Sequence, residues 1–303
     1  MRFSVVIPVY NKANTLKASI DSVFAQTFDD FQVVVVDDGS TDHINDVLKG
    51  YDNLTIIHQN NSGVSVARNT GIANSNGEFV CFLDADDLWE DNHLSTLSML
   101  IDKYPDINYF LTSHLISTAD GNTVDSSNYL RDYDYDFKCN DLLNLLNSTS
   151  YSVIHTNSIC VRRSVFGDEN IYFQPGVKIG EDTDVWYRLA LKNTAVVTKE
   201  QTTIYRRENS TATKFSSYVD DWIFSRRLKE IDAAPDILPE IKLSAAVVVD
   251  RYLLNSCRQH MLMKNRQQAL SVLKNIRIKK GKRYLLTKVF CYLPYFVCSI
   301  LIK

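Results

Sequence analysis

Three carboxylates follow a short apolar run in the first third of the chain. Asp84, Asp86 and Asp87 come directly after Val80–Leu83. Carboxylates crowded at the end of a buried strand repel one another unless a cation neutralises them. Mg²⁺ and Mn²⁺ prefer oxygen ligands and keep coordination positions open for substrate phosphates. The sequence therefore predicts a divalent-cation and diphosphate site here, with an Asp-rich turn as the alternative.

A second acidic group stands at the start of an amphipathic stretch. Glu181, Asp182 and Asp184 precede the apolar-periodic segment 185–190. Acidic residues at a helix N-terminus complement the helix dipole. A carboxylate within reach of a substrate hydroxyl can also act as a general base. Both interpretations remain open from the residues alone.

The elements that must position these groups alternate between strand and helix patterns. Four apolar, β-branched runs have strand length: Phe3–Ile7, Phe31–Val36, Leu54–Ile57 and Phe79–Leu83. Helical spacing separates them in residues 16–24 and 64–73. The order βαβαβ predicts a parallel sheet with right-handed crossovers and helices on both faces.

Ligands of such sheets bind beyond the carboxyl ends of the strands. The segments at those ends are Pro8–Asn11, Asp37–Ser40 and Asp84–Asp87. Residues 104–180 are less regular, and we expect sheet edges and loops there that could form an acceptor site. From residue 218 to 278 the pattern is helical.

Four blocks, in this order, resemble the family 2 glycosyltransferases of GT-A fold. They are Ser4–Asn11, Val35–Asp42, Ser62–Gly71 and Leu83–Asp87. The resemblance covers about the first ninety residues, returns at Gly180–Asp182 and Ile204–Arg206, and fades after about residue 215. It implies an α/β fold with a Rossmann-like, mostly parallel sheet flanked by helices. We expect a catalytic domain over residues 1–215 and a helical C-terminal region over residues 216–303.

The resemblance also implies an activity, namely inverting transfer of a hexosyl or N-acetylhexosaminyl group from a UDP-sugar to an acceptor hydroxyl. By the resemblance, Asp38, with Asp37, hydrogen-bonds the uracil edge. The residues expected to contact the nucleotide-sugar are Pro8, Val9, Tyr10, Asn11, Asp37, Asp38, Arg68, Asp84, Ala85 and Arg206. Asp182 is expected to be the catalytic base, with Glu181 positioning it or the acceptor.

The resemblance implies a Mn²⁺ or Mg²⁺ site at the Asp-x-Asp motif. Asp86 is the expected direct ligand, with Asp84 nearby and Glu208 where many relatives have a histidine. Glutamate is a suitable oxygen ligand for a hard cation. A glutamate ligand would alter the metal preference, and a Glu208 side chain that faces water is the alternative.

Purely structural roles are the alternatives for several of these residues. Asp37 and Asp38 could form a turn before Gly39, Arg68 could lie on a solvated helix face, and Arg206 could belong to an exposed basic pair. Two other functions compete with glycosyl transfer: a phosphotransferase or nucleotidyltransferase that uses the Asp-rich site, and a non-catalytic subunit that binds nucleotide-sugar. A dinucleotide oxidoreductase is disfavoured because no GxGxxG follows the first strand.

Charge is distributed unevenly along the chain. The net charge is −3, from 33 Lys/Arg and 36 Asp/Glu, yet residues 264–303 contain ten Lys/Arg and no acid. The basic run Lys279–Arg283 precedes an apolar, aromatic stretch whose uncharged part, Val289–Ile302, is fourteen residues long. That is short of the roughly 20 residues a spanning helix needs.

The tail, residues 279–303, is therefore predicted to bind an anionic inner-leaflet surface, with burial or true spanning as alternatives. We expect no nucleic-acid partner. The expected location is cytoplasmic, peripheral on the inner membrane, and the expected acceptor is a lipid-linked saccharide of surface polysaccharide synthesis. Six cysteines at wide spacings, without a CxxC pair, disfavour a disulfide framework or a zinc ribbon.

Overall fold

The computed structural model describes residues 1–118, 121–149, 153–177, 179–207, 221–295 and 297–298. The chain divides into two compact units. The first comprises Met1–Gly176 and Glu181–Ser210, and the second comprises Val177–Gly180 and Thr211–Lys303. Both the domain boundary expected after residue 215 and the expected metal ligand Glu208 lie outside the described residues.

The first unit is built on one mixed sheet, which has ten strands within the described residues. The strands are β1 (Phe3–Val9), β2 (Phe31–Asp37), β3 (Leu54–His58), β4 (Phe79–Phe82), β5 (Leu88–Trp89), β6 (Tyr109–Ser117), β7 (Thr123–Asp125), β8 (Asp136–Cys139), β9 (Ile159–Arg162) and β10 (Ala195–Arg206). Their order is β3-β2-β1-β4-β9-β6-β10-β5, with β7 beside β6 and β8 beside β10.

Parallel pairing joins the four N-terminal strands, as the βαβ pattern predicts. Phe3 of β1 pairs with Phe31 of β2 and with Phe79 of β4, and β2 pairs in parallel with β3. Next to them, β9 runs antiparallel to both β4 and β6, so β6 and its parallel neighbour β10 point the same way as β4. The carboxyl ends of β1, β2, β4 and β10 therefore share one edge of the sheet.

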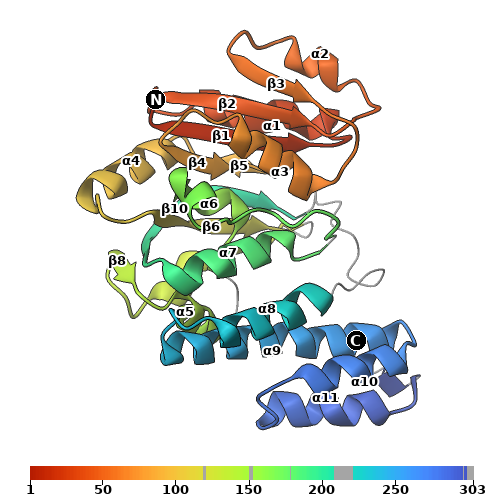
Figure 1. Cartoon of the computed structure of the whole chain (residues 1–303). Helices are drawn as coiled ribbons and strands as arrows, with labels where there is room; N and C mark the ends of the chain where they lie inside the picture. Colours follow the sequence, from red (N-terminus) through yellow and green to blue (C-terminus); the bar gives the residue numbers. More distant parts are fainter. Residues whose placement is uncertain (119–120, 150–152, 178, 208–220, 296, 299–303) are drawn as a thin grey trace. The chain divides into compact units, whose positions relative to one another are not determined.

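Helices cover both faces of this sheet (Figure 1). In the first unit they are α1 (Ala13–Phe24), α2 (Ile44–Leu48), α3 (Val64–Ala73), α4 (His93–Lys103), α5 (Leu142–Ser148), α6 (Ser164–Asp168) and α7 (Glu181–Lys192), with short 3₁₀ turns at Ser126–Leu130 and Thr156–Ser158.

Alternating side chains of β1 reach opposite faces, as the strand period of two requires. Val5 and Ile7 join the buried cluster that contains Leu16 of α1. Val6 faces α3 instead, where a Cβ on Gly71 would meet its Cγ1 at 2.2 Å. Glycine at position 71 therefore allows α3 to lie close to the sheet, and a continuous apolar run is what a strand buried on both faces needs.

Residues 104–180 differ from the expectation of sheet edges and loops. β6 and β9 lie inside the sheet, and Tyr109, Phe110, Cys160 and Val161 are fully buried. The polar residues of this region hid these strands from a hydrophobicity-based prediction. Part of the polarity is accommodated by hydrogen bonds between strands, as where Ser113 Oγ donates to the Thr198 carbonyl at 3.0 Å.

The second unit is helical, as the sequence predicts. It contains α8 (Asp221–Ala233), α9 (Pro239–Leu262), α10 (Arg266–Asn275) and α11 (Lys282–Tyr292). The long α9 contacts each of the other three. Buried Asp250 of α9 accepts backbone N–H groups from Arg277 and Ile278, which ties the chain after α10 to α9. Among the described helices, none combines the length and the apolarity needed to cross a bilayer.

Candidate active site

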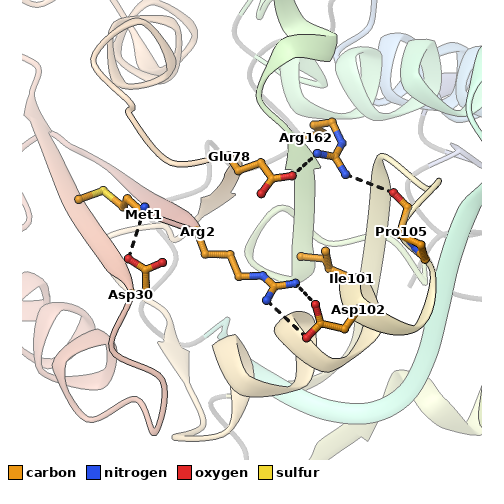
Figure 2. A pocket seen from close by; sticks show the side chains of 8 residues that line it. All are labelled: Met1, Arg2, Asp30, Glu78, Ile101, Asp102, Pro105 and Arg162. Atoms are coloured by element: carbon orange, nitrogen blue, oxygen red, sulfur yellow. Dashed lines mark hydrogen bonds and ion pairs between the residues drawn. The ribbon is translucent and has the colours of Figure 1, made fainter.

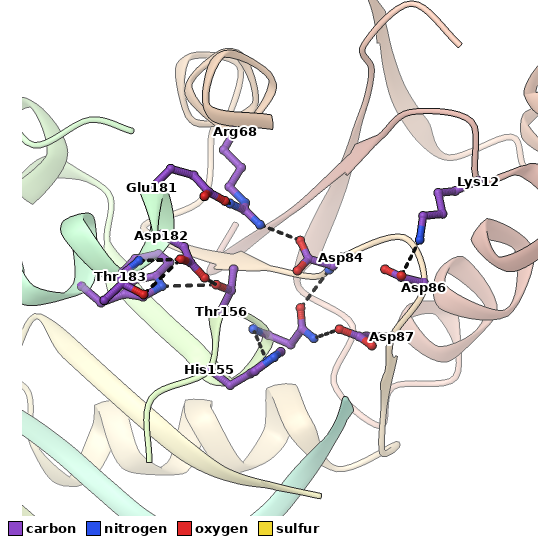
Figure 3. Close-up of polar contacts among 12 residues, drawn as sticks. Lys12, Arg68, Asp84, Asp86, Asp87, His155, Thr156, Glu181, Asp182 and Thr183 are labelled. Atoms are coloured by element: carbon purple, nitrogen blue, oxygen red, sulfur yellow. Dashed lines mark hydrogen bonds and ion pairs between the residues drawn. The ribbon is translucent and has the colours of Figure 1, made fainter. Parts of the chain in front are cut away.

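The Asp84–Asp87 loop leaves β4 at the shared carboxyl edge (Figure 3). Asn157 holds this loop in place through two hydrogen bonds. The Asp84 backbone N–H donates to Asn157 Oδ1 at 2.9 Å, and Asn157 Nδ2 donates to Asp87 Oδ2. The Arg206 backbone N–H, at the end of β10, donates to Asp87 Oδ1 at 2.8 Å. Asp87 is thus a structural anchor that joins two strand ends. Burial, and then the nearby Asp84 charge, raise the pKa of Asp87 to about 8.

Arg68 of α3 connects the two acidic motifs. Its Nη2 donates to Asp84 Oδ1 at 2.8 Å, and its Nη1 donates to Glu181 Oε1 at 3.0 Å (Figure 3). The guanidinium lies over the Phe173 ring, 5.3 Å from the centroid, and the side chain is 4% exposed. The structure therefore excludes the solvated-face interpretation of Arg68. One buried cation links residues that are far apart in the sequence.

The pKa values of the two partners follow from this arrangement. For Asp84, burial favours the neutral acid, but the charge and hydrogen bond of Arg68 outweigh it and lower the pKa. For Glu181, burial and then the charge of Asp182 raise the pKa to about 7, and Arg68 opposes the shift. Glu181 can therefore hold a proton near neutral pH, whereas Asp84 stays ionised.

Lys12 occupies one side of Asp86. Its Nζ lies 2.5 Å from Asp86 Oδ2, and both side chains are about 15% exposed. Within the described residues, Asp84 Oδ2 and Asp86 Oδ1 have no hydrogen-bond or ion-pair partner, so each acid keeps a carboxylate oxygen for another ligand.

Two carboxylate oxygens at one edge suit a hard cation that completes its shell with phosphate oxygens. The described residues contain no group of three or more His, Cys, Asp or Glu arranged to hold a metal ion. The two free oxygens of Asp84 and Asp86 fit a cation that keeps other coordination positions for phosphate oxygens. The role of Glu208 stays a prediction outside the described residues.

Asp182 lies in the first turn of α7, where two donors fix its carboxylate. Thr156 Oγ1 donates to Oδ2 at 3.0 Å, and the Thr183 backbone N–H donates to Oδ1 at 2.6 Å (Figure 3). Thr156 Oγ1 in turn accepts from Trp186 Nε1 at 3.2 Å. Asp182 is half-buried, so a substrate can still reach it. An oriented, accessible carboxylate has the geometry of a general base.

His155 is a further residue of this site that the sequence did not single out. Its Nδ1 accepts the Asn157 backbone N–H at 3.4 Å, and its ring lies 4.5 Å from the Tyr205 ring. Burial lowers its pKa, although the charges of Asp84 and Asp182 oppose the shift. His155 is therefore a neutral imidazole between the two acidic motifs.

Thr156 and Asn157 also went unnoticed in the sequence, for a topological reason. They immediately precede β9, which runs antiparallel to β4. Its beginning therefore lies at the edge where the parallel strands end. The only signal in the sequence is a short polar run before a buried strand. This run indicates a site residue only once the direction of the strand in the sheet is known.

At the predicted nucleoside end, Asp38 is already engaged in hydrogen bonds. Its Oδ1 accepts Gln59 Nε2 at 2.7 Å and the Ser62 N–H at 2.9 Å, and its Oδ2 accepts the Gly63 N–H at 2.8 Å. Asp38 is buried and holds the loop between β3 and α3. Uracil recognition by Asp38 stays a prediction and would use the one remaining lone pair on Oδ2.

Residues of the segments Pro8–Asn11 and Asp37–Ser40 join the ends of β1 and β2. Asn11, at φ 51°, donates its N–H to Ser40 Oγ at 3.0 Å and accepts the Thr41 N–H at 2.8 Å. Asp37 accepts the Ser40 N–H at 2.9 Å and pairs with His58 Nδ1 at 2.9 Å. Burial opposes the ionised form of Asp37, but these bonds prevail and lower its pKa.

The remaining predicted nucleotide contacts differ in their exposure. Pro8, Val9 and Ala85 are buried, whereas Tyr10 is 47% exposed beside Asn11. The Arg206 side chain is half-buried at the end of β10, which brings it to the edge occupied by Asp87.

A separate hollow lies at the opposite, amino-terminal edge of the sheet (Figure 2). Its charged groups are paired with one another: Arg2 with Asp102, and Arg162 with Glu78. None of the predicted site residues lines it. The candidate active site is therefore the carboxyl edge.

Comparison with known proteins identifies the family of the chain. The model of the family described as glycosyl transferase family 2 matches residues 4–168, which is more than half of the chain. The chain belongs to glycosyl transferase family 2. The matched span contains all four sequence blocks, Arg68 and the residues Thr156 and Asn157.

Curated relatives of this family 2 chain match it over part of their length. GlyA of Streptococcus pneumoniae is 39% identical over 107 residues, covering 34% of this chain and 15% of the relative. The succinoglycan biosynthesis protein ExoW of Rhizobium meliloti is 45% identical over 101 residues, covering 31% and 32%. An uncharacterised glycosyltransferase of Rickettsia bellii is 32% identical over 206 residues, covering 63% and 27%. The chain thus spans less than a third of the length of these relatives.

Solved structures share the fold. Residues 1–349 of Staphylococcus aureus TarS match with a TM-score of 0.71 at 20% identity, covering the whole of this chain and 92% of the other. The TarS complex with UDP-GlcNAc gives a TM-score of 0.67 at 21% identity, covering 97% and 82%. Mannosyltransferase PcManGT from Pyrobaculum calidifontis, bound to GDP-Man and Mn²⁺, gives 0.59 at 17%, covering 99% and 83%. The predicted GT-A fold is confirmed.

Proposed function

We propose that this family 2 glycosyltransferase transfers a hexosyl or N-acetylhexosaminyl group from a UDP-sugar to a hydroxyl of a lipid-linked saccharide, with inversion at the anomeric carbon. The observation that carries the proposal is the meeting of two acidic motifs at one sheet edge. Arg68 bridges Asp84 and Glu181, and the accessible Asp182 is the next residue along α7. One motif suits a diphosphate and its cation, and the other suits an acceptor hydroxyl.

Asp182 is the proposed base. Thr156 and the Thr183 N–H hold its two oxygens, which orients the carboxylate before the acceptor arrives. The acceptor hydroxyl gives its proton to Asp182 while its oxygen forms a bond to the anomeric carbon. The bond between that carbon and the diphosphate oxygen breaks, and UDP leaves with the electron pair. Attack on the face opposite the leaving group inverts the configuration.

The departing diphosphate needs positive charge. Asp86 and Asp84 would hold a Mn²⁺ or Mg²⁺ ion, which neutralises the charge that develops on the leaving group. Lys12, already beside Asp86, supplies a further positive charge at this edge. Arg68 keeps Asp84 ionised and in place, and so preserves an oxygen donor for the cation.

The donor and acceptor classes rest on the relatives. The structural neighbour TarS is known with bound UDP-GlcNAc and with UDP, which supports a UDP-sugar donor. The relative ExoW is named as a succinoglycan biosynthesis protein, which supports a role in polysaccharide assembly. The basic run Lys279–Arg283 and the apolar residues after it support a lipid-linked acceptor.

The test is release of UDP by the purified chain from a panel of UDP-sugars with Mn²⁺ or Mg²⁺. We expect release from one donor to require metal and to disappear in Asp86→Ala. Asp182→Asn keeps the shape of the side chain and should lower kcat about 10²- to 10⁴-fold, the usual contribution of a general base. Asp46→Asn, at a 76% exposed acid of α2, is the matched control and should behave as wild type.

Two outcomes would contradict parts of the proposal. Full activity of Asp182→Asn would remove Asp182 as the base. Release of inorganic phosphate, or a phosphorylated intermediate at Asp84, would revive the phosphotransferase alternative. If UDP binds but no donor is turned over, adding a lipid extract as acceptor separates a missing acceptor from the non-catalytic alternative.

A further inference from the structure

Helix α11 has two apolar faces, of which only one is packed within its unit. Tyr284, Thr287, Phe290 and Cys291 are buried on the side that meets α9 and α10. The other side carries Leu285, Leu286, Val289 and Tyr292, which are 57%, 53%, 58% and 64% exposed. At about 3.6 residues per turn, these four side chains share an arc of roughly 120° opposite the packed side. We call them the outer face of α11.

An outer face of this composition needs an explanation. Single exposed apolar residues are normal on protein surfaces, but a contiguous apolar patch commonly marks a binding site. Other large exposed apolar side chains of the first unit, such as Tyr10, Met99 and Tyr172, belong to separate elements. On α11, four such side chains fall within two helical turns.

Basic side chains surround the outer face. Lys279, Lys280, Lys282, Arg283 and Lys288 are all exposed. Within the described residues none of the five has an ion pair with an acid, whereas Arg277 pairs with Asp232. The sequence supplies no acid after residue 263. An apolar stripe flanked by unneutralised cations is complementary to a surface that has apolar and anionic parts side by side.

We propose that the outer face of α11 docks on an anionic lipid surface, with the helix lying in the plane of the membrane interface. Leu285, Leu286 and Val289 would enter the region between headgroups and acyl chains, and Tyr292 would lie at the headgroup level. The five basic side chains would contact lipid phosphates. The inference concerns only the second unit and does not rest on the proposed reaction chemistry, although the lipid-linked acceptor of the proposed function rests on the same region. The inference names an anionic membrane surface as a partner of the protein, and docking there would bring a lipid-linked acceptor within reach.

The test compares binding of the full chain to two kinds of vesicle by co-sedimentation. One kind is phosphatidylcholine alone, and the other contains phosphatidylglycerol in addition. We expect binding to the anionic vesicles only, weakened by added salt. A variant with Leu285→Gln, Leu286→Gln and Val289→Gln should bind at least about tenfold more weakly, because it lacks the three apolar side chains that would be buried in the membrane interface.

Matched controls separate docking from loss of structure. Leu243→Gln changes a 63% exposed leucine of α9 and should leave vesicle binding unchanged. Lys279→Gln with Lys280→Gln should weaken anionic binding several-fold, whereas Lys264→Gln with Lys274→Gln, at exposed positions outside the basic run beside α11, should have a smaller effect. An unchanged circular dichroism spectrum would show that each variant is folded, and unchanged UDP affinity would show that the first unit is intact.

Three results would overturn the proposal. They are no binding of the wild type to anionic vesicles, equal binding of the outer-face variant, and equal binding to both kinds of vesicle. A wild-type dimer in sedimentation that the outer-face variant lacks would show that a second copy covers this face instead. None of these results depends on catalysis, so failure here is distinct from failure of the proposed reaction.

Discussion

Arg68 offers a sharp test of how the site is held together. Replacing it by methionine keeps an unbranched side chain over Phe173 but removes the cation between Asp84 and Glu181. Two carboxylates then remain near one another without compensation. If Arg68 served only to contact the nucleotide, as the family resemblance implies, the same variant would lose UDP affinity and keep its stability.

The magnitude follows from burial. Removing one partner of a buried ion pair costs about 3–5 kcal/mol, mainly because the other charge is left unpaired. Asp84 keeps 30% of its side-chain surface exposed and Glu181 keeps 12%, so water partly compensates both acids. We therefore expect the lower end, about 3 kcal/mol for Arg68→Met. For a unit of this size each kcal/mol shifts Tm by about 2–4 °C, which gives a fall of about 6–12 °C.

The pH dependence has a defined sign. In the wild type the pKa of Asp84 is lowered, so this group adds stability above its unfolded pKa, and that stability is lost as pH falls through the folded pKa. The pKa of Glu181 is raised from 4.5 to about 7, so the stability that this group adds at low pH is lost as pH rises from the unfolded pKa through about 7. Without Arg68 both acids become harder to ionise. The gap in Tm between wild type and variant should be largest near pH 8. It should narrow as the acids of the variant take up protons at lower pH, and close only below the lowered pKa of Asp84 in the wild type.

The assay is thermal unfolding followed by circular dichroism at several pH values, with UDP affinity measured alongside. Arg68→Lys is the matched control. It keeps the charge but cannot span both acids, so its Tm should fall between the other two. A fall in Tm below about 2 °C at pH 7.5, or a gap that does not change with pH, would refute the bridging role.

Three further predictions concern single residues. Lys12→Met should tighten binding of Mn²⁺ alone about fivefold in calorimetry, because the competing cation at Asp86 is worth on the order of 1 kcal/mol; unchanged or weaker binding would contradict this. Thr156→Val should lower kcat about tenfold with little change in KM, because the Asp182 carboxylate loses one of the two donors that orient it; an unchanged kcat would contradict it. Gly77→Ala should cost at least about 2 kcal/mol or prevent soluble expression, because its Cβ would meet the backbone of β1 at 2.5 Å; a denaturation curve like that of the wild type would show that β1 can move.

Much of the first unit could be predicted because its central parallel strands, β1 and β4, are buried on both faces. Phe3–Val9 and Phe31–Asp37 need continuous apolar runs, and such runs are visible in one sequence. Short polar segments after each run mark the carboxyl edge, where parallel sheets bind ligands. From that rule alone, Asp86 could be predicted to lie at the candidate site before any of its contacts was known.

The strands that the sequence missed have mixed polarity. Ile159–Arg162 is four residues long and lies antiparallel between β4 and β6. Nothing in four residues gives their direction or their neighbours. The prediction therefore lost Thr156 and Asn157, because only the antiparallel course of β9 brings its beginning to the active edge.

The sequence by itself determined the strand and helix alternation, the sheet edge at which the candidate site lies and the presence of two acidic motifs, because these follow from local periodicity and from the order of segments. The tertiary structure alone decided which charges meet. Arg68 pairs with Asp84 and with Glu181, which lies 113 positions further along the chain. The Asp38 carboxylate accepts hydrogen bonds from the loop between β3 and α3. Such pairings depend on the order of the strands in the sheet and on how far each charged group is removed from water. Neither can be read from a short stretch of sequence.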